Sequence, residues 1–207
     1  MMSSGQFEGR TGNHIITFVA DEIITFAKAN SSHPRSGFIT FIGIKKGKNM
    51  KDIPRITSFS VDHDYITPGV YISRIDGDVV TYDLRTRKPN TGDLMDNATM
   101  HSVEHMFATY VRASEIGASV IYFGPMGCQT GFYLLVRNET KEKVLSVILS
   151  VLEKIISHDS EMFGASRKEC GNYINLSLAL AKEECARYLA ALKSKNQTFE
   201  YPTEEEK

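Results

Sequence analysis

An excess of charge of either sign is absent from this chain. Its 207 residues include 24 lysine and arginine residues against 25 aspartate and glutamate residues, a formal net charge of -1 at pH 7. A protein that binds nucleic acid presents a basic surface to the phosphates. The balanced charge therefore argues against nucleic acid as a partner.

Long apolar runs are absent as well. A membrane-spanning helix needs about 20 mostly apolar residues, whereas the densest apolar stretch, 144–152, is short and contains serine. The opening MMSSGQFEGR lacks the apolar core of a signal peptide. We therefore expect a cytoplasmic protein without a membrane partner.

Cysteine is scarce, since the chain has only Cys128, Cys170 and Cys185. An odd number of cysteines without an export signal argues against a disulfide framework and predicts reduced thiols. Reduced thiols are free to bind a metal ion or to carry protons.

The first 49 residues differ in pattern from the rest. Apolar spacing predicts one amphipathic helix over 14–27, and 38–44 has the composition of a strand. This piece is too short for a core of its own. We interpret it as an N-terminal extension of unknown role, or as an upstream reading frame with Met50 as the true start.

Residues 50–195 have the pattern of one α+β domain, followed by a polar tail over 196–207. An Asp-Gly pair at 76–77 predicts a hairpin. We expect an antiparallel sheet packed against helices on one side. The expected strands are 70–73, 79–84, 120–123 and 132–136, and the expected helices are 97–115, with Asn97 as N-cap, 141–157 and 176–192.

The motif His101-Ser102-Val103-Glu104-His105 lies inside the expected helix 97–115. Residues three or four apart share a helix face, so both histidines and the glutamate lie together, opposite an apolar stripe. Two such histidines can each direct a ring nitrogen at one metal ion. The alternative is a solvent-facing pair without metal, and the clean amphipathic pattern favours the metal site.

Two histidines do not complete a metal site. The candidates for a third ligand are Cys128, Cys170, Cys185 and His63. Cys185 lies in the middle of an expected helix, where a small buried hydrophobe is the commoner role. Cys128 and Cys170 each lie beside a glycine in a turn, and spacing does not decide which is the ligand and which is an acid or base.

Five motifs follow one another along the chain. They are SFSVDH at 58–63, YDLR at 82–85 with KPN at 88–90, HSVEH at 101–105, PMGCQTGFY at 125–133 and CGNY at 170–173. In order and spacing they resemble the S-ribosylhomocysteine lyases, the LuxS family, over 53–192. The chain departs from the family pattern at Ser102, where threonine is common, and at Tyr122-Phe123-Gly124, where many members have Asp-Ile-Ser.

The resemblance implies a role for each of eight residues. The metal ligands would be His101, His105 and Cys170, and the acid/base pair would be Glu104 and Cys128. The substrate-binding residues would be Ser58, His63 and Arg85. The resemblance also implies one Fe²⁺ per subunit, with Zn²⁺ or Co²⁺ as substitutes, and a homodimer with its sites at the interface.

The reaction implied by the resemblance is metal-dependent cleavage of the thioether of S-ribosylhomocysteine. Two carbonyl shifts and a β-elimination would give homocysteine and 4,5-dihydroxy-2,3-pentanedione, the precursor of autoinducer-2 in quorum sensing. Homocysteine would return to the methyl cycle.

Two other functions compete with this one. An inverted-motif (HxxEH) zinc metallopeptidase would share the helix with two histidines and a glutamate, but it would leave the Cys-Gly-Asn-Tyr and Met-Gly-Cys motifs unexplained. A non-catalytic module would use the metal only to stabilise its fold.

Overall fold

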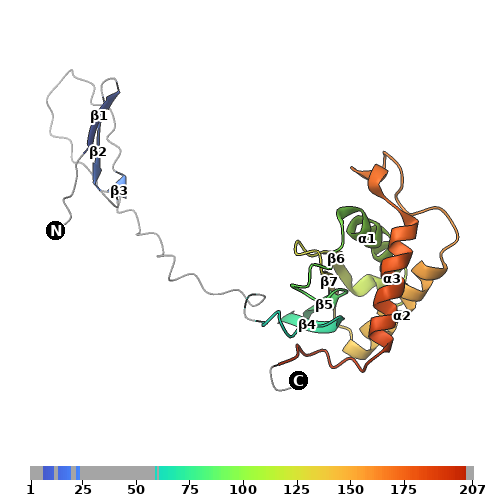
Figure 1. The fold of residues 1–207 in the computed structure, drawn as a ribbon. Helices are drawn as coiled ribbons and strands as arrows, with labels where there is room; N and C mark the ends of the chain where they lie inside the picture. The colour runs from blue at the N-terminus through green and yellow to red at the C-terminus, as the bar shows by residue number, and fades with distance from the viewer. Residues whose placement is uncertain (1–6, 12–13, 20–21, 24–58, 60, 204–207) are drawn as a thin grey trace. The chain divides into compact units, whose positions relative to one another are not determined.

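The computed structural model describes residues 7–11, 14–19, 22–23, 59 and 61–203, and the chain divides into two compact units, Met1–Lys51 and Asp52–Lys207 (Figure 1). Ser58 therefore lies outside the described residues, as do the expected strand 38–44 and Met50. Within the described residues, no helix is both long enough and apolar enough to cross a membrane.

The first unit contains a three-stranded antiparallel sheet in the order β1-β2-β3, formed by β1 (Phe7–Thr11), β2 (His14–Val19) and β3 (Glu22–Ile23). The expectation of a helix over 14–27 is therefore wrong at 14–19 and 22–23. Residues 15–19 (IITFV) are all β-branched or aromatic, and such residues favour strands over helices.

The second unit is built on a four-stranded antiparallel sheet in the order β4-β5-β7-β6. Its strands are β4 (Gly69–Asp76), β5 (Val79–Arg85), β6 (Val120–Pro125) and β7 (Gly131–Arg137). The turn between β4 and β5 places Gly77 at φ 62°, the left-handed conformation that glycine adopts without steric cost. The predicted hairpin is thus confirmed.

Helix α1 (Asn97–Arg112) follows the β4–β5 pair, α2 (Lys141–Ser157) follows the β6–β7 pair, and α3 (Leu178–Lys193) follows α2. Each begins after an N-cap whose side-chain oxygen accepts a backbone N–H three residues on. Asp96, and not Asn97, is the N-cap of α1, because its Oδ1 accepts the Thr99 N–H at 2.7 Å. The helix ends at Arg112, three residues before the expected end.

The core lies between one face of the sheet and the helices (Figure 1). Side chains alternate along β5 and β7, so Tyr82, Leu84, Phe132 and Leu134 are buried in this core. The expected α+β fold is confirmed.

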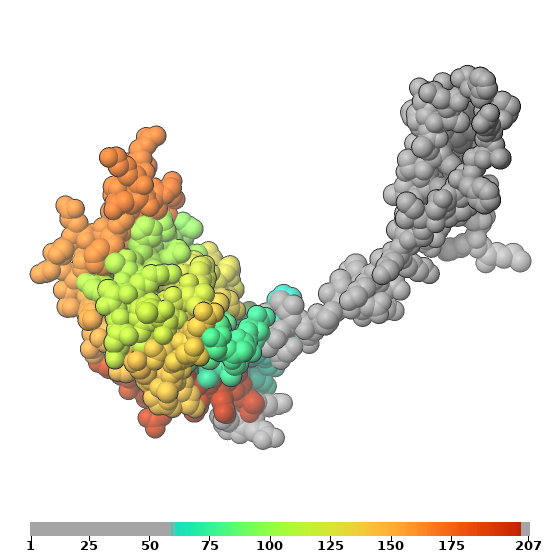
Figure 2. Space-filling model, turned by 180° about the vertical axis from the view of Figure 1, so that it is seen from behind, coloured from blue at the N-terminus to red at the C-terminus, as the bar shows by residue number. Residues whose placement is uncertain are grey.

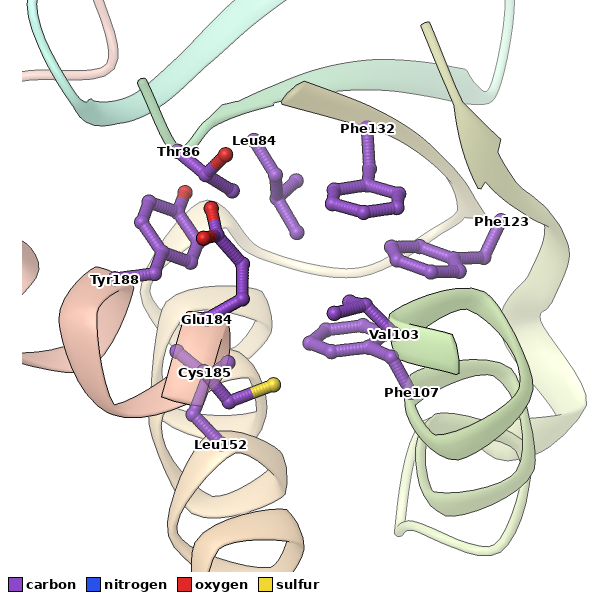
Figure 3. Close-up of a pocket in the computed structure, with 10 residues that line it drawn as sticks. All are labelled: Leu84, Thr86, Val103, Phe107, Phe123, Phe132, Leu152, Glu184, Cys185 and Tyr188. Atoms are coloured by element: carbon purple, nitrogen blue, oxygen red, sulfur yellow. The ribbon is translucent and has the colours of Figure 1, made fainter. Parts of the chain in front are cut away.

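A small apolar cavity of about 10 Å³ lies inside this core, where α3 meets α1 and the sheet (Figure 3). Cys185 lines it and is 1% exposed, as expected for a packing residue. Burial raises the pKa of the Cys185 thiol, which keeps it protonated and unreactive. This cavity therefore belongs to the packing of the core and contains no candidate chemistry.

The chain returns to the sheet after α3 (Figure 1). The Ile72 N–H donates to the Phe199 carbonyl at 2.8 Å, and Phe199 is buried. Residues expected as a polar tail thus include an apolar anchor on the outer strand β4.

Candidate active site

Helix α1 presents the two histidines and the glutamate of the HSVEH motif on one half-buried face. The opposite face buries Val103, Met106, Phe107 and Val111. The expected division into a core face and a polar face is confirmed. Packing of the apolar stripe therefore fixes the direction in which the polar face points.

Cys170 supplies the third donor to this face. The ligand atoms of His101, His105 and Cys170 all lie within 4.8 Å of one another. The Cys170 Sγ is 3.3 Å from His101 Nε2, and the Asn172 backbone N–H donates to the same sulfur at 3.4 Å. Of the two turn cysteines, the structure therefore brings Cys170 to the histidines.

Hydrogen bonds orient both imidazole rings. His101 Nδ1 is 2.7 Å from Asn175 Oδ1, and the Asn175 amide donates to Asn97 Oδ1 at 2.7 Å, so the Oδ1 is free to accept from the ring. His105 Nδ1 lies 3.0 Å from the Phe163 carbonyl. Each ring then carries its proton on Nδ1 and its lone pair on Nε2, the tautomer that binds a metal.

Gly164 allows the backbone to come close to the second histidine. It has φ 66°, and a Cβ at this position would lie 2.7 Å from His105 Nδ1. A side chain at position 164 would push the His105 ring away from the Phe163 carbonyl, so this close approach of the backbone requires glycine.

The donor set fits a divalent transition metal. Two neutral imidazoles and one thiolate are ligands for Zn²⁺, Fe²⁺ or Co²⁺, and three protein ligands leave a fourth position for water or substrate. The segment between α2 and α3 that carries Cys170 projects from the body of this unit (Figures 1 and 2). From this segment the Cys170 thiol contacts His101 on the polar face of α1.

A cavity of about 250 Å³ opens beside these donors. It is lined by Asn97, Met100, His101, Glu104, Pro125 and Asn172. Glu104 and His101 therefore share one cavity wall, within reach of one small ligand.

Cys128 lies in the turn between β6 and β7, which the Met126 N–H closes on the Gly131 carbonyl at 2.9 Å. The residue is exposed. Its Sγ is 3.1 Å from Thr130 Oγ1 and 3.7 Å from Arg85 Nη1. A guanidinium stabilises a neighbouring thiolate more than a neutral thiol.

Arg85 is buried in an ion pair beneath this turn. Its Nη2 donates to Asp83 Oδ2 at 2.5 Å, and its Nη1 donates to Thr130 Oγ1 at 2.6 Å. Burial raises the pKa of the Asp83 carboxyl, and the guanidinium opposes that shift. Buried ion pairs are stable only where geometry and further hydrogen bonds are good.

The predicted site residues thus form two groups. One is the metal group of His101, His105 and Cys170, with Glu104 on the adjoining cavity, and the other pairs Cys128 with Arg85. His63 is half-buried, and its Nδ1 is 3.0 Å from the Val61 carbonyl. It is close enough to Asp83 for a positive charge on its ring to lower the pKa of that carboxyl.

Sequence reasoning missed several supporting residues, namely Asp83, Thr130, Phe163 and Asn175. Asp83 had a usable signal, because it is two residues before Arg85 on a strand and so shares its face. Thr130 lies two residues after Cys128, inside the 125–133 motif. Phe163 and Asn175 meet the histidines across long sequence separations, which no local pattern records.

Comparison with known proteins places these residues in a family context. The model of the family described as "S-Ribosylhomocysteinase (LuxS)" matches residues 56–199. An S-ribosylhomocysteine lyase of Borreliella afzelii is 41% identical over 155 residues, covering 72% of this chain and 99% of the relative. The enzyme of Finegoldia magna is 40% identical over 154 residues, covering 72% of this chain and 98% of the relative. That of Clostridium beijerinckii is 40% identical over 141 residues, covering 65% of this chain and 89% of the relative.

Proposed function

Because the chain belongs to the S-ribosylhomocysteinase (LuxS) family, we propose that it is a carbon–sulfur lyase. It cleaves the thioether of S-ribosylhomocysteine to homocysteine and 4,5-dihydroxy-2,3-pentanedione, the autoinducer-2 precursor. The observation that carries this proposal is the donor set of His101, His105 and Cys170, of which His101 lines one cavity together with Glu104.

The proposed metal is Fe²⁺, one per subunit, with Zn²⁺ or Co²⁺ as substitutes, held by His101, His105 and Cys170. When bound, such an ion supplies Lewis acidity toward the carbonyl and hydroxyl oxygens of the sugar. Asn175 and the Phe163 carbonyl support the site by holding both imidazole rings in the metal-binding tautomer.

Glu104 and Cys128 are proposed to carry protons. The sugar aldehyde is remote from sulfur, so the carbonyl must move by two positions before elimination is possible. In each shift a proton leaves one carbon and another is added to the neighbouring carbon that held the carbonyl. Loss of a further proton beside the new carbonyl then breaks the carbon–sulfur bond, and homocysteine leaves. A carboxyl and a thiol are both side chains that can accept and donate protons in general acid–base catalysis.

Arg85, His63 and Ser58 are proposed to bind the substrate. Arg85 is only 3% exposed, and its donors already reach Asp83, Thr130 and Cys128. These contacts also support a role for Arg85 in holding Cys128.

We further propose a homodimer with its sites at the interface. Large apolar side chains are exposed within four residues, along the chain, of two residues that line the cavity. Ile121 and Tyr122 precede Pro125 on β6 and are 43% and 48% exposed, and Ile174, which follows Asn172, is 80% exposed. Burial of such side chains favours association. All three cysteines are free, which suits the reducing cytoplasm that we propose as the location.

The deciding experiment supplies S-ribosylhomocysteine to anaerobically purified protein and follows free homocysteine thiol with a chromogenic disulfide. We expect thiol release that stops after metal removal and returns when metal is added back. Glu104→Gln is the matched control, since it keeps the side-chain shape but loses the proton carrier. Metal binding without thiol release would favour the non-catalytic module. The metallopeptidase alternative has no support, because the third donor is a thiol and the relatives named above are lyases.

A further inference from the structure

The C-terminal segment makes a specific contact with the sheet outside the site described so far. Phe199 forms a parallel bridge with Tyr71 on β4 and is 6% exposed within the core cluster. Its backbone has φ 66°, a conformation that residues other than glycine rarely adopt. The buried Phe199 side chain therefore fixes the backbone of this segment against β4, and Tyr201, two residues later, lies against the sheet.

Tyr201 lies on the face of β4 and β5 opposite the helices. Its ring stacks on Tyr71, with centroids 4.8 Å apart and 15° between the planes. Its hydroxyl donates to Asp83 Oδ2 at 2.9 Å. Burial raises the pKa of the Tyr201 phenol, so the hydroxyl is protonated and acts as the donor.

This hydrogen bond ends a continuous chain of contacts. Asp83 Oδ2 accepts both from Tyr201 and from Arg85 Nη2, and Arg85 Nη1 reaches Thr130 Oγ1 and Cys128 Sγ. Within the described part of the chain, Asp83 Oδ1 and Arg85 Nε are the buried polar side-chain atoms without a hydrogen-bond partner. The buried pair therefore makes few hydrogen bonds, and loss of any one of them leaves a further buried polar atom without a partner.

We propose that Tyr201 is a positioning residue, which through Asp83 fixes the Arg85 guanidinium against the Cys128 sulfur. The proposal rests on the role of Cys128 as a proton carrier in the proposed function. Without the Tyr201 hydroxyl, Asp83 keeps Arg85 as its one side-chain hydrogen-bond donor among the described residues. The guanidinium is then held less firmly beside Cys128, so it stabilises negative charge on the sulfur less well while the sulfur carries a proton or attacks an alkylating reagent.

The test compares Tyr201→Phe with Tyr71→Phe in the full-length, metal-loaded protein. Both variants keep the stacked pair of rings, but only the first removes the bond to Asp83, because the Tyr71 hydroxyl donates to the Thr67 carbonyl. We expect Tyr201→Phe to lower kcat about tenfold, with KM and metal content unchanged, and to slow alkylation of Cys128 by iodoacetamide at pH 7 by a similar factor. Tyr71→Phe should stay close to wild type in all four measurements.

Wild-type kcat and alkylation rate in Tyr201→Phe would overturn the proposal and leave the lyase function standing. Equal losses in both variants, together with equal falls in Tm, would also overturn it, since the segment would then only stabilise the fold. Full activity of Cys128→Ala would instead contradict the proposed function. Alkylation sites are identified by peptide mass, so that Cys128 is separated from Cys170.

Discussion

At the scale of single residues, the site is defined by the surroundings of its donor atoms more than by its residue types. The three cysteines illustrate this. Cys185 is buried in the core, Cys170 lies 3.3 Å from an imidazole nitrogen, and Cys128 is exposed beside a guanidinium. One residue type thus has three environments, which correspond to packing, to the proposed metal binding and to the proposed proton transfer.

The two reactive cysteines should respond differently to the same substitution. Cys128→Ala should keep the metal while kcat falls by roughly 10²–10⁴, the range for loss of a general acid or base. Cys170→Ala should lose metal and activity together, because it removes a donor. Metal analysis and turnover of both variants check this. Metal loss in Cys128→Ala with metal retained in Cys170→Ala would reverse the assignment.

Asn175 should control metal affinity without being a ligand. Asn175→Ala removes the acceptor of the His101 Nδ1–H, and loss of such a partner weakens metal binding by roughly 10–100-fold. Asn175→Asp keeps an acceptor oxygen and should retain most of the affinity. Competition with a chromogenic chelator measures both variants, and equal affinity in Asn175→Ala and wild type would refute the role.

At the scale of elements, helix α1 connects fold stability to the site because it carries His101, Glu104 and His105. Its N-cap is a single carboxylate, that of Asp96. The hydrogen bond from the Thr99 backbone N–H lowers the pKa of Asp96, so the capping contribution requires the ionised form.

Asp96→Ala should destabilise the metal-free protein by about 1 kcal/mol at neutral pH. The folded-state pKa is lowered, so this contribution is complete above the unfolded-state pKa of about 4 and disappears as pH falls through the folded-state pKa. Urea unfolding of the metal-free wild type and of metal-free Asp96→Ala at several pH values measures this difference in the free energy of unfolding. A difference in stability that stayed constant into strong acid would contradict the ionised cap.

At the scale of the whole molecule, association is expected to complete the site. Solution mass by light scattering should be twice the 23.2 kDa of the chain. Ile121→Glu on β6 should shift the protein toward the monomer and lower activity, because a charge on a buried apolar surface is unfavourable. Ile75→Glu is the matched control, since Ile75 is 62% exposed at the hairpin end of β4. A fully active monomer would rule out a shared site.

The sequence by itself determined the second unit to a large extent. The α2 bounds, the β4–β5 hairpin and the α1 apolar stripe follow from local periodicity and turn chemistry, which act within a few residues. The same reasoning failed at 14–19, where a helical spacing of apolar residues competed with β-branched composition and the strand prevailed.

Only the tertiary structure decided which groups meet. Cys170 joins His101 across 69 residues, and Tyr201 reaches Asp83 across 118. The motif order indicated the ligands through family resemblance, whereas Asn175 and Tyr201 had no sequence signal. Their positions depend on how the segments after α2 and α3 fold back onto α1 and β4, and packing between distant segments is what sets that path.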